Sequence, residues 1–212
     1  MAQREFSQEM RNVDLFAQVR AESLKRLLTV SENLMRDQVL ASMRLLKEVG
    51  GRQYGMPRID GNITILGRRI PALYLGTHPQ TNDFALVDHV TAIMGGTATL
   101  FVKAGNDFVR VSTNVVQKGN LRAVGTVLDP NGKAIQAIRK GEPFYGVVDI
   151  LGTPYITGYE PMFDAEHQII GIWYVGFKVD IQALRDAVER TKLLKSGFAA
   201  VLDANKHIRF LF

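Results

Sequence analysis

The fold is decided by residues 97–114, which read TATLFVKAGNDFVRVSTN. Two runs in this stretch, Thr97–Lys103 and Phe108–Asn114, are rich in β-branched and aromatic residues, which favour extended strands. The residues between the runs, Ala104–Asp107, include the glycine, asparagine and aspartate that tight turns use. The stretch therefore predicts a β-hairpin.

Further short strands and helices flank this hairpin. Apolar runs predict strands at Ile63–Leu66, Ile70–Leu75, Phe144–Ile150, Tyr155–Phe163 and Ile169–Phe177, with a tight turn within Ile59–Ile63. Helical spacing before a glycine predicts short helices at Phe84–Met94 and Lys133–Lys140. Because tight turns join most of the strands, antiparallel pairing is the economical arrangement. The predicted class is α+β, with a central antiparallel sheet of about five to six strands and helices on one side.

A long helix precedes the sheet. Residues 6–49 contain no glycine and no proline, apolar side chains recur at helical spacing, and Gly50-Gly51 ends the pattern. Such a helix would extend about 66 Å, which is more than one compact domain covers. Two interpretations stay open. One is a pair of helices or a coiled-coil arm, and the other is a stalk whose C-terminal half packs on the domain.

The sequence divides into three segments. Residues 1–50 form the long N-terminal helix, residues 51–179 the sheet-containing domain, and residues 180–212 a C-terminal helix and strand pair. In the last segment Asp180 begins a predicted helix to about Leu194, and a hairpin joins Phe198–Leu202 to Ile208–Phe212. This segment ends on an apolar residue, as a truncated piece would.

Composition places the chain among ordinary globular proteins. Of its 212 residues, 46% are hydrophobic and 22% are charged, so a core and a soluble surface are both expected. The formal net charge of +5 is spread out, without the basic run that marks nucleic-acid binding. No apolar run is long enough to span a bilayer, and no signal peptide is visible. We expect a soluble protein or a soluble piece of a membrane protein.

Catalytic and metal-binding motifs are absent from the sequence. There is no cysteine, which excludes disulfides, thiolate metal sites and cysteine nucleophiles. The four histidines, His78, His89, His167 and His207, lack the pair spacing of metal ligands. There is no nucleophile elbow and no Walker loop. We therefore expect no enzyme activity and no cofactor.

The strand at Phe108–Asn114 carries the first candidate binding residues. Side chains alternate between the two faces of a strand, so Arg110 and Ser112 should share one face. An arginine between valines is costly to bury unpaired. Two alternatives stay open: Arg110 pairs with a carboxylate such as Asp107 or Asp149, or its planar guanidinium binds the carboxylate of a ligand.

A second strand adds hydroxyl groups. Tyr155, Thr157 and Tyr159 share one face at a period of two, and Tyr145 lies on the strand before them. Tyrosines in this pattern are more often packing residues than site residues. Beside a strand that carries an arginine and a serine, they would supply the donors and apolar walls of a small polar pocket.

Several blocks of this sequence resemble a known family. They are GGTATLF at 95–101, DFVRVSTNV at 107–115, RAVGTVL at 122–128, YITGYEPMFD at 155–164 and IGIWYVG at 170–176. In this order, over roughly residues 50–179, the blocks resemble the single Cache sensor domains, in particular the Cache_3–Cache_2 fusion type.

The resemblance implies a PAS-like Cache fold, in which a long N-terminal helix packs along the antiparallel sheet. It implies a position in the periplasm or outside the cell, between two transmembrane helices of a chemotaxis receptor, histidine kinase or cyclase. It also implies a small-molecule ligand, often a carboxylate, in a pocket between the sheet and its loops. Residues 51–179 would then be the Cache sensor domain, and residues 1–50 would continue the first transmembrane helix.

The function that we expect is the sensing of a short carboxylate, such as acetate, propionate or pyruvate, by a membrane-anchored receptor of the methyl-accepting chemotaxis type. Arg110 and Arg122 would supply charge. Hydrogen bonds and walls would come from hydroxyl-bearing residues, which are Ser112, Thr126, Tyr145, Tyr155, Thr157 and Tyr159.

Two alternative functions stay open. In the first, the ligand is an amino acid or amine held by Asp149 or Glu160, and the sensor belongs to a histidine kinase or cyclase. In the second, the chain is a dimerisation module that binds no ligand and works through its long helix. A homodimer through this helix is expected, and binding to nucleic acid is not.

Overall fold

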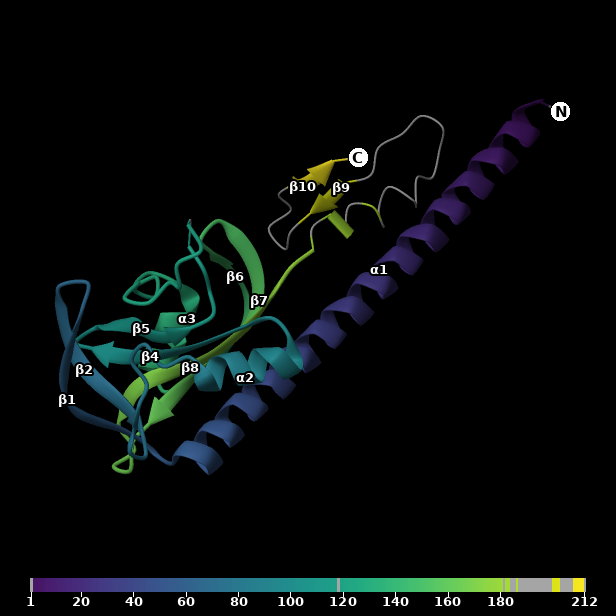
Figure 1. The fold of residues 1–212 in the computed structure, drawn as a ribbon. Helices are drawn as coiled ribbons and strands as arrows, with labels where there is room; N and C mark the ends of the chain where they lie inside the picture. The colour runs from purple at the N-terminus through teal and green to yellow at the C-terminus, as the bar shows by residue number, and fades with distance from the viewer. Residues whose placement is uncertain are drawn as a thin grey trace. The chain divides into compact units, whose positions relative to one another are not determined.

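The computed structural model describes residues 2–117, 119–180, 182–183, 186, 200–202 and 208–211. Its helices are α1 (Ala2–Val49), the short π-helix η1 (Gly50–Tyr54), α2 (Ala85–Met94) and α3 (Lys133–Arg139). Its strands are β1 (Pro57–Ile65), β2 (Arg68–Leu75), β3 (His78–Pro79), β4 (Thr97–Ala104), β5 (Asp107–Thr113), β6 (Phe144–Ile150), β7 (Thr153–Phe163), β8 (Ile169–Lys178), β9 (Ala200–Leu202) and β10 (Ile208–Leu211). The ribbon in Figure 1 labels these elements. The chain divides into two compact units, residues 35–179 and residues 1–34 with 180–212.

The larger unit, residues 35–179, is built on two antiparallel sheets. A main sheet has five strands in the order β5-β4-β8-β7-β6, and a smaller sheet has three in the order β1-β2-β3. Neighbouring strands in both sheets run antiparallel. The predicted hairpin is present as β4 and β5. These findings confirm the α+β class and the central antiparallel sheet.

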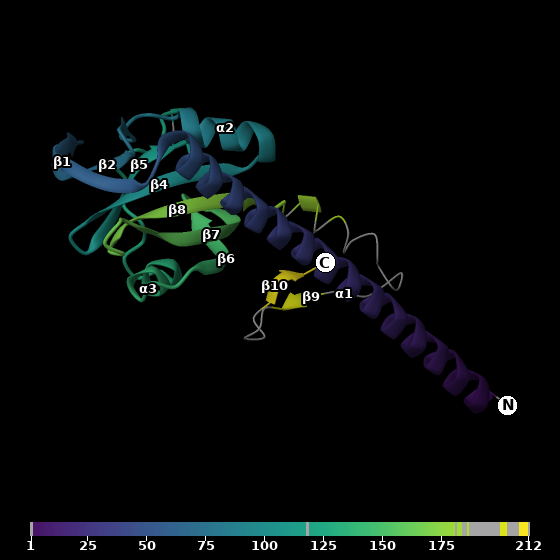
Figure 2. The same ribbon diagram turned by 90° about the horizontal axis from the view of Figure 1, so that it is seen from below.

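Helices cover both faces of the main sheet. Met43 and Leu46 of α1 lie in one buried core with the apolar face of α2 and with Leu100 of β4. On the opposite face, Phe101 of β4 packs in a second core with Ile135 of α3. Figure 2 shows α2 and α3 on opposite sides of the strands. The expectation of helices on one side only was wrong, because α3 and the loops around it bury the second face.

Helix α1 is a single helix rather than a pair. Within the larger unit its fully buried apolar residues are Val39, Met43 and Leu46, which lie three or four positions apart. This spacing puts them on one face of a helix, and that face packs against the sheet. The long N-terminal helix packed along the sheet is therefore confirmed.

The first hairpin differs from the prediction. Its turn lies at Leu66–Gly67, between β1 and β2, and not within Ile59–Ile63. The register of β1 against β2 shifts around Gly61, whose φ is 71°. Glycine adopts this left-handed conformation without strain, and a β-bulge uses it to accommodate an extra residue. The Asp60-Gly61 pair thus marks a bulge within one strand.

The smaller unit contributes β9 and β10, which pair antiparallel as the terminal hairpin was predicted to do. The residues of its turn, 203–207, lie outside the described residues. Asp180 Oδ1 accepts a hydrogen bond from the backbone N–H of Ala183 at 2.9 Å, as a helix N-cap does. Most of the helix predicted to follow lies outside the described residues, and the division into three segments stays a prediction.

Candidate functional site

Arg110 lies in β5 with its side chain in the second core, and only 7% of the residue is exposed. Its Nη1 donates a hydrogen bond to Thr126 Oγ1 at 2.8 Å. Its guanidinium carbon lies 4.9 Å from the centre of the Phe101 ring, in position for a cation–π contact. The Nε–H is buried and has no hydrogen-bond partner among the described residues. The guanidinium therefore keeps an unused donor inside the protein.

No carboxylate neutralises Arg110 in the described part of the chain. Asp107 accepts a hydrogen bond from Arg68 at 2.8 Å, and Asp149 accepts one from the backbone N–H of Gly152 at 2.8 Å. Burial lowers the pKa of Arg110, because desolvation disfavours the charged form. An arginine keeps its proton nonetheless. The pairing of Arg110 with Asp107 or Asp149 is thus not observed, and the buried charge lacks a counter-ion that an anionic ligand would supply.

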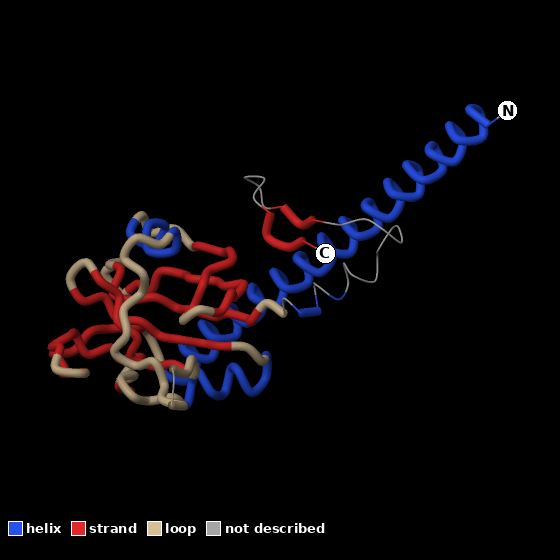
Figure 3. Tube along the Cα trace, turned by 90° about the horizontal axis from the view of Figure 1, so that it is seen from above, coloured by secondary structure: helices blue, strands red, loops and turns tan. Residues whose placement is uncertain are grey.

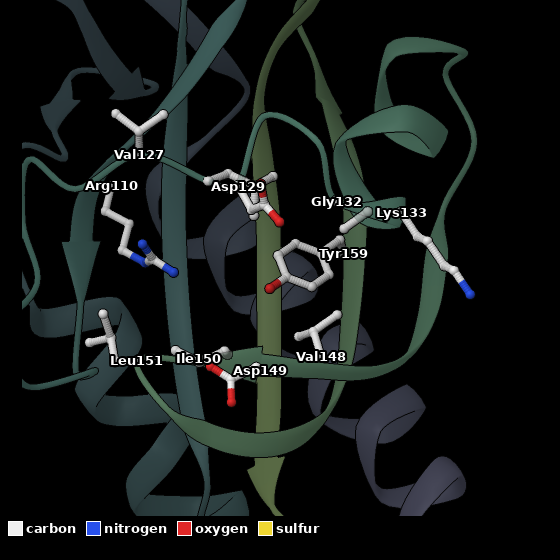
Figure 4. Close-up of a pocket in the computed structure, with 12 residues that line it drawn as sticks. Arg110, Val127, Asp129, Gly132, Lys133, Val148, Asp149, Ile150, Leu151 and Tyr159 are labelled. Atoms are coloured by element: carbon white, nitrogen blue, oxygen red, sulfur yellow. The ribbon is translucent and has the colours of Figure 1, made fainter. Parts of the chain in front are cut away.

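Arg110 faces a cavity of about 380 Å³. Its apolar lining residues are Val127, Leu128, Ala134, Val148, Ile150 and Leu151. Its polar lining residues are Arg110, Asp129, Lys133, Asp149 and Tyr159. Figure 4 shows the Arg110 guanidinium and the Tyr159 hydroxyl turned toward each other, whereas the Lys133 amine and the Asp149 carboxylate point away from them. A small anion would therefore meet the Arg110 guanidinium and the Tyr159 hydroxyl between apolar walls, and the carboxylates of Asp129 and Asp149 belong to the same lining.

The loop between β5 and α3, tan in Figure 3, fixes Arg110 from the side. The backbone N–H of Arg110 donates to the Thr126 carbonyl at 2.9 Å, and the backbone N–H of Gly125 donates to the Arg110 carbonyl at 2.8 Å. Thr126 Oγ1 in turn donates to the Ala123 carbonyl at 2.7 Å. Gly125 has a φ of 84°, and a Cβ there would lie 2.7 Å from Leu66. The loop thus acts as an edge strand that holds Thr126 against the guanidinium.

Aromatic rings form the floor beside Arg110. Tyr159 of β7 and Tyr174 of β8 have ring centres 4.8 Å apart, and both rings lie near that of Phe101. Burial raises the pKa of Tyr159 to about 12, and it also raises the pKa of Tyr174. Tyr174 shares a hydrogen bond of 3.1 Å with Thr97, and no hydrogen bond of the Tyr159 hydroxyl is found among the described residues. The Tyr159 hydroxyl is therefore a neutral donor available to a ligand.

Ser112 lies on the other face from Arg110. The β4–β5 register shifts so that Leu100 pairs with Ser112 while Phe101 pairs with Arg110. Cross-strand partners share a face and successive residues alternate, so the extra residue Val111 separates Ser112 from Arg110. The Ser112 hydroxyl donates to the carbonyl of Asp83, ahead of α2, at 2.5 Å. The prediction that Arg110 and Ser112 share a face was wrong, because strand alternation does not reveal a bulge.

Two other predicted residues have protein partners elsewhere. Arg122 donates from Nη1 and Nη2 to the carboxylate of Asp88 at 2.7 and 2.9 Å. Tyr145 donates to Glu160, which also accepts a hydrogen bond from Lys47 of α1 at 2.6 Å. Burial and the bond to Glu160 raise the pKa of Tyr145. Neither Arg122 nor Tyr145 is among the described residues that line the cavity beside Arg110.

The remaining predicted residues, Tyr155 and Thr157, are not among the described residues that line the cavity. Tyr155 is half-buried and packs against the second core, to which Tyr159 belongs. Thr157 is fully buried, and its hydroxyl donates to the Gly146 carbonyl at 2.8 Å. The structure therefore brings together Arg110, Thr126 and Tyr159, whereas Tyr155 and Thr157 are not among the described lining residues.

Two loops contribute lining residues that we did not predict. Asp129 and Lys133 stand around the turn before α3, and Leu151 stands at the turn between β6 and β7. The sequence signalled the first turn through Asp129-Pro130-Asn131-Gly132, and Asp129 Oδ1 accepts from the Asn131 N–H at 3.0 Å as such turns do. That signal predicts the turn but not the residues that it contacts in the folded chain, because the loop's path over the sheet depends on long-range packing.

Among the residues that the structure describes, no cluster of histidine, aspartate and glutamate could hold a metal ion. No helix formed by them is both long enough and apolar enough to cross a membrane.

The chain was compared with known families and proteins. Residues 1–210 match the Cache 3/Cache 2 fusion domain, which confirms the resemblance seen in the sequence. Among solved structures, it is similar to the crystal structure of the E. coli DcuS sensor domain, with 15% identity and a TM-score of 0.34 over 50% of this chain and 71% of that one. No curated protein matches.

Proposed function

We propose a function for this chain from the premise that it belongs to the Cache 3/Cache 2 fusion domain family, whose members are extracytoplasmic sensor domains. The chain would bind a small molecule outside the cytoplasm and signal as part of a transmembrane receptor. Residues 35–179 form the compact unit that holds the candidate site. A methyl-accepting chemotaxis protein is the receptor type that we propose.

The proposed ligand is a carboxylate that binds Arg110. The observation that carries this proposal is the buried guanidinium of Arg110, which has no carboxylate partner among the described residues and faces a cavity. Arginine and carboxylate match in geometry, since two parallel N–H donors meet two oxygens. Binding in a dry site strengthens such a pair, because less water competes for it.

Three residues of the predicted site carry the proposal. Arg110 would bind the carboxylate, the Tyr159 hydroxyl would donate a second hydrogen bond, and Thr126 would hold the guanidinium in place. Arg122 donates two hydrogen bonds to Asp88, so we assign it no contact with the ligand.

A second candidate is an amino-acid sensor of a histidine kinase or cyclase. It is favoured by Asp149, which lines the same cavity as Arg110 and could accept a hydrogen bond from a ligand ammonium. Glu160, the other carboxylate considered for this role, is bound to Lys47 and Tyr145 and is not among the described lining residues. An Asp149→Asn variant that loses amino-acid binding but keeps carboxylate binding would favour this second candidate.

Signal transfer would use β7. Tyr159 on one face of this strand lines the cavity, and the adjacent Glu160 on the other face forms an ion pair with Lys47 of α1. A ligand that moves β7 would therefore move the contact with the long helix. Such a ligand must bind one of two arrangements more tightly, because equal affinity for both shifts no population.

The test is a thermal-shift screen of the 212-residue chain against small carboxylates, amino acids and amines. A ligand at 100 times its dissociation constant should stabilise the fold by about 2.7 kcal/mol, which shifts the melting temperature measurably. We expect carboxylates to raise the melting temperature and Arg110→Met to abolish the rise. Arg69→Met, which replaces an exposed arginine of β2, is the matched control and should keep the rise in melting temperature.

Two outcomes count against the carboxylate sensor. If Arg110→Met binds carboxylates as well as the parent chain, the anion lies elsewhere. If no compound shifts the melting temperature of a folded parent chain, the helix-mediated dimerisation module becomes the better account of the protein.

A further inference from the structure

We propose that the ligand at Arg110 is a monocarboxylate with a branched or aromatic apolar body, and that acetate and dicarboxylates bind more weakly. This inference rests on the proposed carboxylate function and narrows its ligand class. It is carried by the charges around the cavity, by the apolar residues of its walls and by its volume.

The charges favour a single carboxylate. Arg110 is the one buried cation among the described lining residues, and Asp129 and Asp149 are exposed at the cavity rim. Lys133 is an exposed cation of the same lining, so the rim carries two carboxylates and one amine. A ligand with one carboxylate on Arg110 and a second at its far end would place that second charge where negative charge is in excess. Like charges at short range oppose each other, so the rim should disfavour dicarboxylates.

The walls favour an apolar body. Six apolar residues line the cavity, and they come from two segments: Val127, Leu128 and Ala134 from residues 127–134, and Val148, Ile150 and Leu151 from residues 148–151. Apolar ligand surface that contacts these side chains leaves water, and each buried methylene is worth about fourfold in affinity. A carboxylate without such a body would gain binding free energy only from its contacts with Arg110 and Tyr159.

The volume of the cavity also favours a ligand with an apolar body. The cavity measures about 380 Å³, which is in the range of roughly 300–1,000 Å³ seen for pockets that take drug-sized ligands. Acetate would occupy a small part of this space and leave most of the apolar wall in contact with water. A body the size of a branched butyl group or a benzene ring would cover more of the wall.

The first experiment compares ligands on the parent chain by isothermal titration calorimetry. The probes are acetate, 3-methylbutanoate, benzoate and succinate, with 3-methylbutanamide as the uncharged counterpart of 3-methylbutanoate. Three added carbons should make 3-methylbutanoate bind about 60-fold more tightly than acetate. Its heat-capacity change on binding should also be more negative, which marks apolar burial. We expect no measurable binding of the amide, and succinate should bind no more tightly than acetate.

The outcomes separate this inference from the function on which it rests. If acetate binds as tightly as 3-methylbutanoate, or succinate binds more tightly than both, the apolar-monocarboxylate inference is overturned while the carboxylate sensor stands. If no carboxylate binds and the chain is folded, both fail.

The second experiment uses neighbouring valines of β6. Val148 lines the cavity, whereas Val147 is 63% exposed and is not among the described lining residues. Threonine keeps the shape of valine and suits a strand, so both Val148→Thr and Val147→Thr should fold. Val148→Thr should lower the affinity for 3-methylbutanoate by about tenfold, because an apolar ligand body leaves the new hydroxyl unpaired. The affinity of Val148→Thr for acetate should stay within about twofold of the parent value. Val147→Thr should change the affinity for neither ligand. Equal effects of the two variants would contradict the proposed wall.

Discussion

Arg110 is a residue whose burial works against the stability of the free protein. It is 7% exposed, has no carboxylate partner among the described residues and keeps its Nε–H unbonded. A buried unpaired charge destabilises a fold, and binding sites often retain such groups because the ligand compensates them. The same feature that makes Arg110 a candidate for ligand binding therefore predicts an effect on stability without ligand.

We predict that Arg110→Met stabilises the ligand-free chain by about 1–3 kcal/mol, because methionine removes the buried charge and keeps most of the side-chain volume. Urea unfolding of the parent and variant chains measures the difference. Arg69→Met, which changes an exposed arginine of β2, should leave the free energy of unfolding within about 0.5 kcal/mol. A marked loss of stability in Arg110→Met alone would mean that the guanidinium is held by a compensating partner.

The sequence predicted Arg110 as a candidate but left its role open. Its place between two valines indicated a costly burial, which the structure confirms. Whether Asp107 or Asp149 would neutralise it was not predictable, since both are near in sequence or strand order. Asp107 instead binds Arg68 from β2, and this contact depends on how a separate hairpin packs.

At the scale of elements, β7 joins the two faces of the main sheet. Its residue Glu160 binds Lys47 of α1 at 2.6 Å, and 22% of the Glu160 side chain and 46% of the Lys47 side chain are exposed. Partial burial reduces screening by water, and the bond from Tyr145 restrains the carboxylate further. We therefore expect this pair to matter more than an ordinary surface pair.

We predict a coupling free energy of about 1 kcal/mol between Lys47 and Glu160 in a double-mutant cycle with Lys47→Met and Glu160→Gln. The control cycle uses Glu48 and Arg52, a more exposed pair four residues apart with side chains 51% and 81% exposed. That pair should couple by about 0.3–0.5 kcal/mol or less. Urea unfolding provides the four free energies of each cycle. Equal coupling in both cycles would argue that Glu160 makes no special contact with α1.

The elements were more predictable than the details of their registers. β-branched and aromatic runs predicted the β4–β5 hairpin and the strands β6, β7 and β8, because these properties are local. The bulges at Gly61 and Val111 were not predictable, since one extra residue in a strand leaves composition and turns unchanged. The second bulge matters most, because it separates Ser112 from Arg110.

At the scale of the whole molecule, α1 offers an apolar stripe for a second copy. Leu27, Val30 and Leu34 are 56%, 55% and 65% exposed, and their spacing of three and four residues puts them on one side of the helix. Two such stripes can pack against each other as in a coiled coil. We therefore expect the homodimer predicted from the sequence to form through this stripe.

We predict that Leu27→Glu and Leu34→Glu each shift the chain from dimer to monomer, because a carboxylate in the stripe would be desolvated at the helix–helix contact. Sedimentation equilibrium measures the change. Thr29→Glu adds the same charge on a different side of α1 and should leave the dimer intact. A parent chain that is monomeric at high concentration would contradict a dimer made through this stripe.

The assembly of the site was the least predictable property of the molecule. Arg110, Thr126 and Tyr159 come from a strand, a loop and a second strand, and they meet only after the main sheet has formed. Strand patterns pointed to Arg110 and Tyr159, and Thr126 was added to the predicted site after the family resemblance. The predicted site also included Arg122 and Tyr145, whose partners Asp88 and Glu160 lie on elements distant in sequence.

The alternation of β7 has a consequence for protein engineering. Tyr159 faces the cavity and Glu160 faces α1, so the proposed recognition and output would use opposite sides of the same backbone. Much of the cavity wall comes from two short segments, residues 127–134 and 148–151, and neither contains a residue of the Lys47–Glu160–Tyr145 contact. A library confined to these two segments could redirect the sensor to new compounds while its connection to the helix stays intact, which is what a modular biosensor requires.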